Sequence, residues 1–417
     1  MSNLNCENQF LKLSKTFGRM VVITVTVVTI ASCATGSISN YPPPPAPVVE
    51  AAPAPVVVEV APVTAPAPEP APVPVLPQVI GKYPQPPPGT IQITVQYATD
   101  REFVSLDKGY SGQPSKTWPY LSYGTVLVSM PEKNRHPGEI PQPGWINFYN
   151  KNDSTKYMLI KKIIKVTGPV FFADLKKSLS NESQIKPAFI YIHGFNNSFK
   201  DAALRTAQIA VDLNIPTVPI FYSWPSRATK KGYPADEESS LWTQSHLLNF
   251  LSEFADNSSA ADIYVIAHSM GNRPTTLALA ALLEGRPELI SRFKQVILAA
   301  PDINAAIFRD DIAPRFAKLK TPVTVYASGK DKALRGSYGI HGWARLGDVE
   351  GPITSIPGVD IIDASNITTN FMGHDYFASN RALLTDVALL FTTGLPARKR
   401  AGLKGIPSGQ PEYWIFP

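Results

Sequence analysis

The stretch that most constrains the fold is residues 262–273, Asp-Ile-Tyr-Val-Ile-Ala-His-Ser-Met-Gly-Asn-Arg. It contains an apolar run of strand type, residues 263–267, and an Ala/Leu-rich stretch of helix type, residues 275–283, follows it. Between the two stands Ser269, with a small residue two positions before it and another two positions after it. A serine at the tip of a tight strand-to-helix turn needs this pattern, because larger flanking side chains would collide with the turn. The stretch therefore predicts a buried strand, a strained turn and a helix.

Such a turn would also suit Ser269 as a nucleophile. The N–H of Met270 would lie at the N-terminus of the helix, where it can stabilise an oxyanion. The small flanking residues are Ala267 and Gly271, and since the usual pattern has glycine first, Ala267 is a mild departure. The alternative interpretation is a buried strand–turn–helix with an incidental serine, and the rest of the chain has to decide between the two.

The first 33 residues have the pattern of an export signal. A segment with three basic side chains precedes an apolar run, residues 20–30, that is too short to span a bilayer. The run ends in Ile-Ala-Ser-Cys33, which resembles a bacterial lipobox, where the signal is cut before the cysteine and that cysteine is acylated. Ala34 follows where an acidic residue would favour the inner membrane. We therefore expect an exported protein with a lipid anchor at Cys33, in the outer membrane; an ordinary cleaved signal and an uncleaved anchor are the alternatives.

Residues 34–89 are expected to be a linker. Most of the segment is built of Pro, Ala and Val with almost no charge, and it holds a large share of the 41 prolines of the chain. Such a composition cannot form a core and favours extended polyproline II, at about 3.1 Å per residue. The segment could reach on the order of 100 Å from a membrane.

Composition also excludes some classes of function. The formal charge of +6 is modest for 417 residues, and no Lys/Arg stripe interleaved with aromatic residues is present, so nucleic acid is not an expected partner. The only cysteine besides Cys33 is Cys6, inside the signal. We therefore expect no disulfide, no thiolate metal site and no cofactor in the mature chain.

Residues 90–395 have the pattern of an α/β domain, followed by a tail at residues 396–417. Alternating residues at 91–97 predict a half-exposed strand, residues 123–130 predict a second strand that ends at Pro131, and two more are expected between about 145 and 166. From residue 188 onward strands and helices alternate, which predicts a mostly parallel sheet with helices on both faces and antiparallel N-terminal edge strands. The expected later strands are 188–192, 218–221, 263–267, 296–300, 323–326 and 359–362, and the expected helices are 171–179, 199–213, 236–254, 275–283, 305–319 and 374–391.

Several short motifs, in order, give the chain its resemblance to a family. They are Tyr97-Ala98-Thr99-Asp100-Arg101, Ile192-His193-Gly194-Phe195-Asn196, Tyr222-Ser223-Trp224-Pro225, Ala267-His268-Ser269-Met270-Gly271-Asn272, Ala300-Pro301-Asp302 and His374-Asp375-Tyr376. Over residues 90–395 the chain resembles the α/β-hydrolases, in particular a bacterial esterase/lipase-like branch long labelled only as a domain of unknown function. The resemblance implies the α/β-hydrolase fold and says little about the substrate.

The resemblance implies a Ser–acid–His order for the catalytic residues. Serine needs a base within hydrogen-bond reach, and an acid has to orient that base. Ser269, Asp331 and His374 each follow an expected strand, so all three are expected at the carboxyl ends of the sheet. Asp302 is the alternative acid and Asp363 the third choice, because each also follows or ends a strand.

The remaining parts of the expected site are the oxyanion hole and a covering segment. The backbone N–H groups of Met270 and Phe195 would hold the oxyanion. His341, in a Gly-rich segment at residues 336–358, is a rival base to His374. That segment, with Trp343, either walls an acyl pocket as a lid or is a surface insertion.

We therefore expect a serine hydrolase that cleaves carboxylic esters, either small molecules or lipids, through an acyl-enzyme and is tethered to the cell envelope. Two other interpretations stay open. One is a catalytically silent hydrolase fold that serves as a binding module, and the other is an amidase or peptidase on the same scaffold, which would use the same residues.

Overall fold

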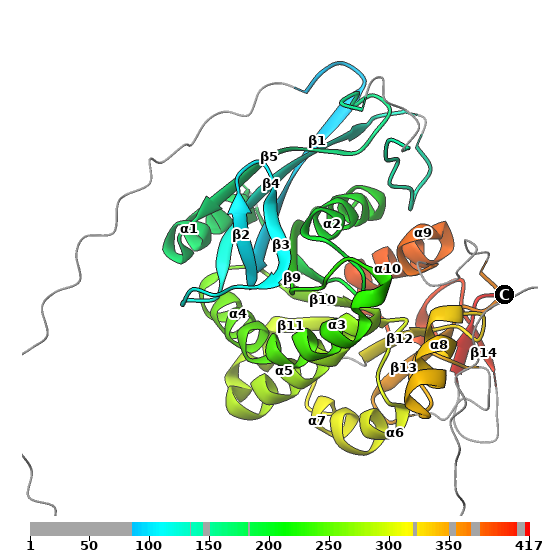
Figure 1. The fold of residues 1–417 in the computed structure, drawn as a ribbon. Coiled ribbons are helices and arrows are strands. Elements are labelled where there is room, and N and C mark those ends of the chain that lie inside the picture. Colours follow the sequence, from blue (N-terminus) through cyan, green and yellow to red (C-terminus); the bar gives the residue numbers. More distant parts are fainter. Residues whose placement is uncertain are drawn as a thin grey trace, which may run out of the picture. The chain divides into compact units, whose positions relative to one another are not determined.

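A computed structural model describes residues 86–133, 135–144, 151–181, 184–319, 323–349, 356–367, 376–406 and 413–417 (Figure 1). Two residues predicted to be functional, Cys33 and His374, lie outside these ranges. None of the helices within them is long and apolar enough to cross a membrane.

The domain is organised around one 11-stranded sheet. The eight central strands run parallel, namely β1, β9, β8, β10, β11, β12, β13 and β15. Strands β4 and β5 at one edge and β14 at the other pair antiparallel. In spatial order the strands of the sheet are β14 Lys404–Ile406, β15 Tyr413–Ile415, β13 Val359–Asp363, β12 Val323–Ala327, β11 Phe293–Ala299, β10 Ile263–His268, β8 Ala188–Ile192, β9 Val218–Ser223, β1 Thr90–Thr99, β4 Ser122–Pro131 and β5 Leu159–Val166. The prediction of a mostly parallel sheet with antiparallel N-terminal edge strands is confirmed.

Both faces of the sheet are buried at its centre, where β8, β9, β10 and β12 are buried at every position. Along β10, Val265 and Ala267 pack into one hydrophobic cluster, whereas Tyr264 and Ile266 pack into the other. Residues of a strand that point to opposite faces thus enter separate cores, which explains why the central strands are continuous apolar runs rather than alternating ones.

Helices cover the two faces as the sequence predicts (Figure 1). The face of Tyr264 is covered by α2 Phe199–Leu213, α9 Tyr376–Ser379 and α10 Arg381–Thr393. The other face is covered by α1 Gly168–Leu179, α4 Gln244–Asn257, α5 Asn272–Gly285, η4 Phe308–Ile312 and α7 Ala313–Phe316, with α3 Tyr233–Trp242 beside α5. The remaining elements are β2 Arg101–Ser105, β3 Gly109–Pro114, β6 Ser180–Asn181, β7 Gln184–Ile185, η1 Lys230–Gly232, η2 Ser269–Gly271, η3 Pro287–Arg292, α6 Ala305–Ile307, α8 Lys332–His341 and η5 Ala397–Lys399.

Five details differ from the sequence prediction. The helix expected at residues 236–254 is two helices, α3 and α4, that meet at Thr243. The helix expected at 305–319 has a π-helical centre, η4, and α8 extends into the Gly-rich segment predicted at 336–358. In the described part of residues 145–166 there is one strand, β5, instead of two. The segment after residue 395 adds β14 and β15 to the sheet, so the sheet extends into the predicted tail.

Candidate active site at the carboxyl edge of the sheet

The turn after β10 has the conformation that the sequence predicts. Ser269 lies between β10 and α5 with a φ of +53°, a left-handed conformation that non-glycine residues rarely adopt. It is 5% exposed. A strained backbone at one serine between a buried strand and a helix is the backbone geometry that a strand-to-helix nucleophile turn requires.

Two glycines allow the backbone to pass close to this serine. A Cβ at Gly271 would lie 2.2 Å from the carbonyl oxygen of His193, so no side chain fits there. A Cβ at Gly194 would lie 2.7 Å from the Cβ of Ser269. The loop after β8 therefore lies directly against the serine turn, as an oxyanion loop must.

The loop after β8 carries Phe195, the second predicted oxyanion donor. Asn196 has a φ of +59°, and the amide of Asn197 donates to the carbonyl of Phe195 at 2.8 Å. The ring of Phe195 packs edge-on against Tyr233, with ring centroids 5.0 Å apart. These contacts fix the path of the loop, while Met270, the other predicted donor, is buried in η2, directly before α5.

A buried arginine also fixes the loop after β8 through hydrogen bonds. Arg101 is 1% exposed and donates to His193 Nε2 at 3.1 Å, to the carbonyl of Asn197 at 2.8 Å and to Ser223 Oγ at 2.8 Å. It also donates to the carbonyls of Ser111 and Ser226. Burial lowers the pKa of Arg101 from 12.5 to about 10, so it stays charged at neutral pH.

His193 is held neutral between these groups. Burial, and then the positive charge of Arg101, lower the pKa of His193 well below 6.5. Arg101 donates to Nε2, so the proton is on Nδ1, which donates to the carbonyl of Gly194 at 2.8 Å. His193 thus shapes the oxyanion loop.

The lowered pKa of His193 predicts acid sensitivity. The folded protein keeps the ring neutral, whereas the unfolded chain binds a proton below pH 6.5. The stability that this residue contributes is therefore present above pH 6.5 and is lost as the pH falls below it, by up to about 1.4 kcal/mol per pH unit. Urea unfolding across this pH range should give a shallower profile for His193→Gln than for the wild type. Parallel profiles for the two proteins would contradict the assignment.

Asp331, the predicted acid, follows β12 and is fully buried. Its Oδ1 caps α8 by accepting from the N–H groups of Ala333 at 3.0 Å and Leu334 at 3.1 Å. Since only β11 separates β12 from β10, these two strands lie about 10 Å apart, and Asp331 follows β12 at the edge of the sheet where Ser269 follows β10.

Asp302, the alternative acid, is occupied by an ion network. Its carboxylate accepts from Arg273 at 2.9 Å, from Tyr233 at 3.0 Å and from Ser337 at 2.6 Å, and it lies 3.3 Å from Arg345 Nε. Burial opposes ionisation, but Arg273, Ser337 and Arg345 outweigh it and lower the pKa of Asp302 below 3.8. These partners tie Asp302 into a buried structural network. Helix α6 is capped by the side chain of Asn304, which accepts from the N–H groups of Ala306 and Ile307, and not by Asp302.

His341 and Asp363, the other predicted candidates among the described residues, both have hydrogen-bond partners. His341 contacts Glu237 Oε1 through Nε2 at 2.6 Å and the carbonyl of Ser337 through Nδ1 at 2.8 Å, so both ring nitrogens have partners. Asp363, at the end of β13, accepts from the N–H of Ser365 at 2.7 Å. The base predicted at His374 lies outside the described residues. Among the described residues, no group of three or more His, Cys, Asp or Glu side chains could hold a metal ion.

Two buried charges near this edge were not assigned a role from sequence. Arg101 ends the motif Tyr97-Ala98-Thr99-Asp100-Arg101. The sequence feature that could have indicated its role is a charged pair directly after a buried strand. Its neighbour Asp100 accepts from Thr243 at 2.5 Å and contacts His246 at 3.0 Å, which ties β1 to the junction of α3 and α4.

Comparison with known proteins supports this assignment of the fold. The profile of one family, described as "Alpha/beta hydrolase of unknown function (DUF900)", matches residues 171–392, a little over half of the chain. That range includes the serine turn, the oxyanion loop and Asp331. A search of curated proteins finds no match.

Three solved structures match this chain at low identity and low TM-score. A predicted CIB-like hydrolase from Thermoplasma acidophilum has a TM-score of 0.31 and 12% identity, over 56% of this chain and 91% of its own. An uncharacterised protein from Capnocytophaga ochracea has a TM-score of 0.30 and 10% identity, over 64% of this chain and 59% of its own. Lipase B from Aspergillus fumigatus has a TM-score of 0.28 and 14% identity, over 49% of this chain and 52% of its own.

Proposed function

This chain belongs to the family of alpha/beta hydrolases of unknown function, and from that premise we propose that it is a serine hydrolase of carboxylic esters. Ser269 is the nucleophile, His374 the base and Asp331 the acid that orients the base. The N–H groups of Met270 and Phe195 form the oxyanion hole. The observation that carries the proposal is the left-handed backbone of Ser269, enclosed by two glycines that no other residue could replace without a clash.

In the first half of the reaction, Ser269 Oγ attacks the ester carbonyl while His374 takes its proton. The carbonyl oxygen becomes an oxyanion that accepts hydrogen bonds from Met270 and Phe195. The tetrahedral intermediate then collapses, the C–O bond to the alcohol breaks, and His374 returns the proton to the leaving alkoxide. The acyl group remains on Ser269.

In the second half, water attacks the acyl-enzyme and gives its proton to His374. The same oxyanion hole holds the second tetrahedral intermediate. Its collapse breaks the bond between the acyl carbon and Ser269 Oγ, His374 returns its proton to that oxygen, and the carboxylic acid leaves. Asp331 keeps the imidazole in one tautomer and stabilises its charged form, without itself taking the proton. Amide bonds would follow the same steps with an amine as leaving group.

The test is covalent labelling with a fluorophosphonate, which reacts only with an activated serine. The full-length wild type should label, and Ser269→Ala and His374→Ala should not. Short-chain p-nitrophenyl esters and the matching anilides, assayed in parallel, separate an esterase from an amidase. If correctly folded wild type neither labels nor turns over either substrate, a binding module without catalysis takes the place of this proposal.

We further propose that the protein is exported and anchored in the cell envelope through a lipid on Cys33, in the outer membrane. The support is the lipobox pattern and the proline-rich segment that follows it. In a bacterial host fed with labelled palmitate, the wild type should take up label and sediment with membranes. Cys33→Ala should lose both properties, and Cys6→Ala, a cysteine inside the signal, should lose neither. Equal labelling of wild type and Cys33→Ala would reject the anchor.

A further inference from the structure

Three successive backbone N–H groups lie in the loop after β8, at Phe195, Asn196 and Asn197. The N–H of Asn196 donates to Asp236 Oδ2 at 3.4 Å, and the N–H of Asn197 donates to Ser226 Oγ at 3.2 Å. Among the described residues, no group accepts a hydrogen bond from the N–H of Phe195. The loop therefore uses two of the three donors for its own structure and leaves that of Phe195 available.

The direction of the Phe195 N–H depends on the carbonyl of Gly194, because both belong to one peptide group. In a trans peptide the C=O and the N–H point to opposite sides. The carbonyl of Gly194 accepts from His193 Nδ1 at 2.8 Å and from Asn197 Nδ2 at 3.3 Å. Two donors thus hold the carbonyl on one side of the peptide group. They direct the N–H to the other side, away from His193 and Asn197.

The side-chain amide of Asn197 has two protons and contacts two carbonyls. One is the carbonyl of Gly194, and the other is the carbonyl of Phe195 at 2.8 Å. Because both neighbours are acceptors, the nitrogen of the amide must face them, and not its oxygen. The Asn197 side chain therefore holds both peptide groups that flank Phe195, and a side chain without N–H groups could not.

Buried charges fix the backbone of Asn197 from two sides. Its carbonyl accepts from Arg101 at 2.8 Å. Its N–H donates to Ser226 Oγ, and the hydroxyl of Ser226 donates to Asp236 at 2.5 Å. Asp236 is fully buried and also accepts from the N–H of Arg227 at 2.7 Å. A side chain on a backbone held in this way has little freedom to leave the two carbonyls.

We propose that Asn197 is a positioning residue that directs the N–H of Phe195 toward the oxyanion of the reaction. The inference rests on the proposed function, in which this N–H is one of the two oxyanion donors. Donors that are fixed before the reaction stabilise the developing charge most, because they do not have to reorganise during it. Asn197 transfers no proton and acts through the peptide group between Gly194 and Phe195.

The test starts with the kinetics of Asn197→Ala and Asn197→Leu, in the full-length chain and with a short-chain ester. Both variants lack the amide, and leucine keeps nearly the same size. Since a misplacement of about 1 Å can cost about 10²-fold, kcat should fall by about that factor with little change in KM. Asn197→Gln, which keeps an amide on a longer side chain, should lose less than either. Circular dichroism confirms that each variant is folded.

A second measurement is specific to the oxyanion. In the matching thionoester, sulfur replaces the carbonyl oxygen, and sulfur accepts hydrogen bonds only weakly. Hydrolysis of the thionoester therefore gains little from the oxyanion donors. In Asn197→Ala and Asn197→Leu, the rate for the ester should fall several-fold more than the rate for the thionoester. Partial unfolding would instead lower both rates equally and leave their ratio unchanged.

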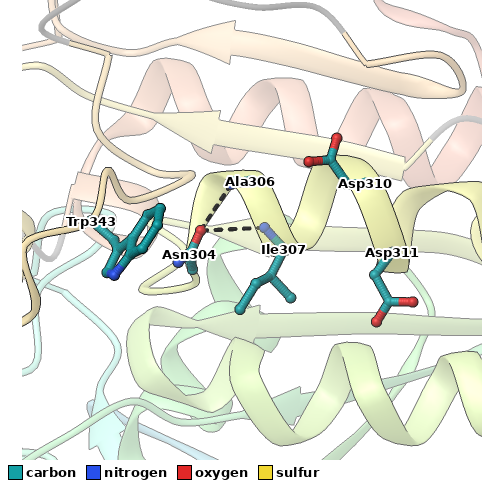
Figure 2. A pocket seen from close by; sticks show the side chains of 6 residues that line it. All are labelled: Asn304, Ala306, Ile307, Asp310, Asp311 and Trp343. Carbon is teal, nitrogen blue, oxygen red and sulfur yellow. Dashed lines mark hydrogen bonds between the residues drawn. The ribbon is translucent and has the colours of Figure 1, made fainter. Parts of the chain in front are cut away.

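Asn304→Ala is the matched control. The side-chain oxygen of Asn304 accepts from the N–H groups of Ala306 and Ile307 and caps α6, at the edge of a hollow of about 480 Å³ (Figure 2). This variant also loses two hydrogen bonds between an asparagine side chain and the backbone, but at a helix outside the oxyanion loop. It should unfold at a lower urea concentration and keep both kcat and the ratio of the ester and thionoester rates.

The outcomes separate a failure of this inference from a failure of the proposed function. Folded wild type that turns over no ester rejects the proposed function, and this inference with it. An active wild type, together with an unchanged rate ratio in Asn197→Ala and Asn197→Leu, overturns the inference alone. An equal fall of the ratio in Asn304→Ala also overturns it, because the effect would then follow stability and not the oxyanion loop.

Discussion

Ser269→Ala is expected to lower kcat for a short-chain ester by about 10⁶-fold, to the level of the binding and oxyanion groups alone. The reason is that the serine and its base act as one unit, and neither works without the other. His374→Ala should lose about as much, and the double variant should lose no more than either single variant. Steady-state kinetics of the three proteins, with circular dichroism to confirm folding, check this result. Losses that multiply in the double variant would mean that the two residues act independently.

The same assay separates the two candidate acids. Asp331→Asn is expected to lower kcat by about 10⁴-fold, because it removes the charge that orients and stabilises the imidazolium. Asp302→Asn should instead lower stability, since its partners Arg273 and Arg345 would lose a buried counter-ion. If folded Asp302→Asn loses as much kcat as Asp331→Asn, the acid has been misassigned.

Arg101→Met is expected to lower the free energy of unfolding by about 3–5 kcal/mol. The substitution removes the donor to His193 and to the carbonyls of Asn197 and Ser226, and it leaves these acceptors buried without a partner. Urea unfolding should show a lower midpoint at an unchanged slope. Because the same contacts hold the oxyanion loop, the protein that remains folded should have a lower kcat with little change in KM.

Two further variants make the role of Arg101 specific. Arg101→Lys keeps the charge but cannot reach acceptors on several sides at once, so it should fall between the wild type and Arg101→Met. Arg286→Met removes an arginine that is 42% exposed and pairs with Asp256 and Glu288, and it should change stability by less than about 0.5 kcal/mol. A similar loss of stability in Arg101→Met and Arg286→Met would rule out the buried network as the cause.

Local sequence predicted the elements that depend on neighbouring residues. The spans of β8 and α2 agree with the expected ones to the residue, because continuous apolar runs and helical spacing specify them locally. The serine turn was predicted for the same reason, since a strained turn requires small residues at fixed offsets, and Gly271 has no room for a side chain.

The errors have long-range causes. Thr243 ends α3 and begins α4 because its hydroxyl donates to Asp100, about 140 positions earlier in the chain. Helix α8 has three glycines in or directly after it, which argues locally against a helix. It forms because Asp331 caps it and because Ser337 and His341 bond to α3 and to the loop after β11. Those partners lie outside residues 332–341, so the local sequence could not predict this helix.

Local sequence specified most of the strands and helices, the serine turn and the candidates for nucleophile, acid and oxyanion donors. These follow from spacing along the chain, where steric limits act between residues a few positions apart. The folded chain alone reveals the ion network around Asp302, the buried contacts of Arg101, and helix α8 with its exposed apolar and basic side chains. Those features depend on which charges are buried together, and burial joins residues that are far apart in the sequence.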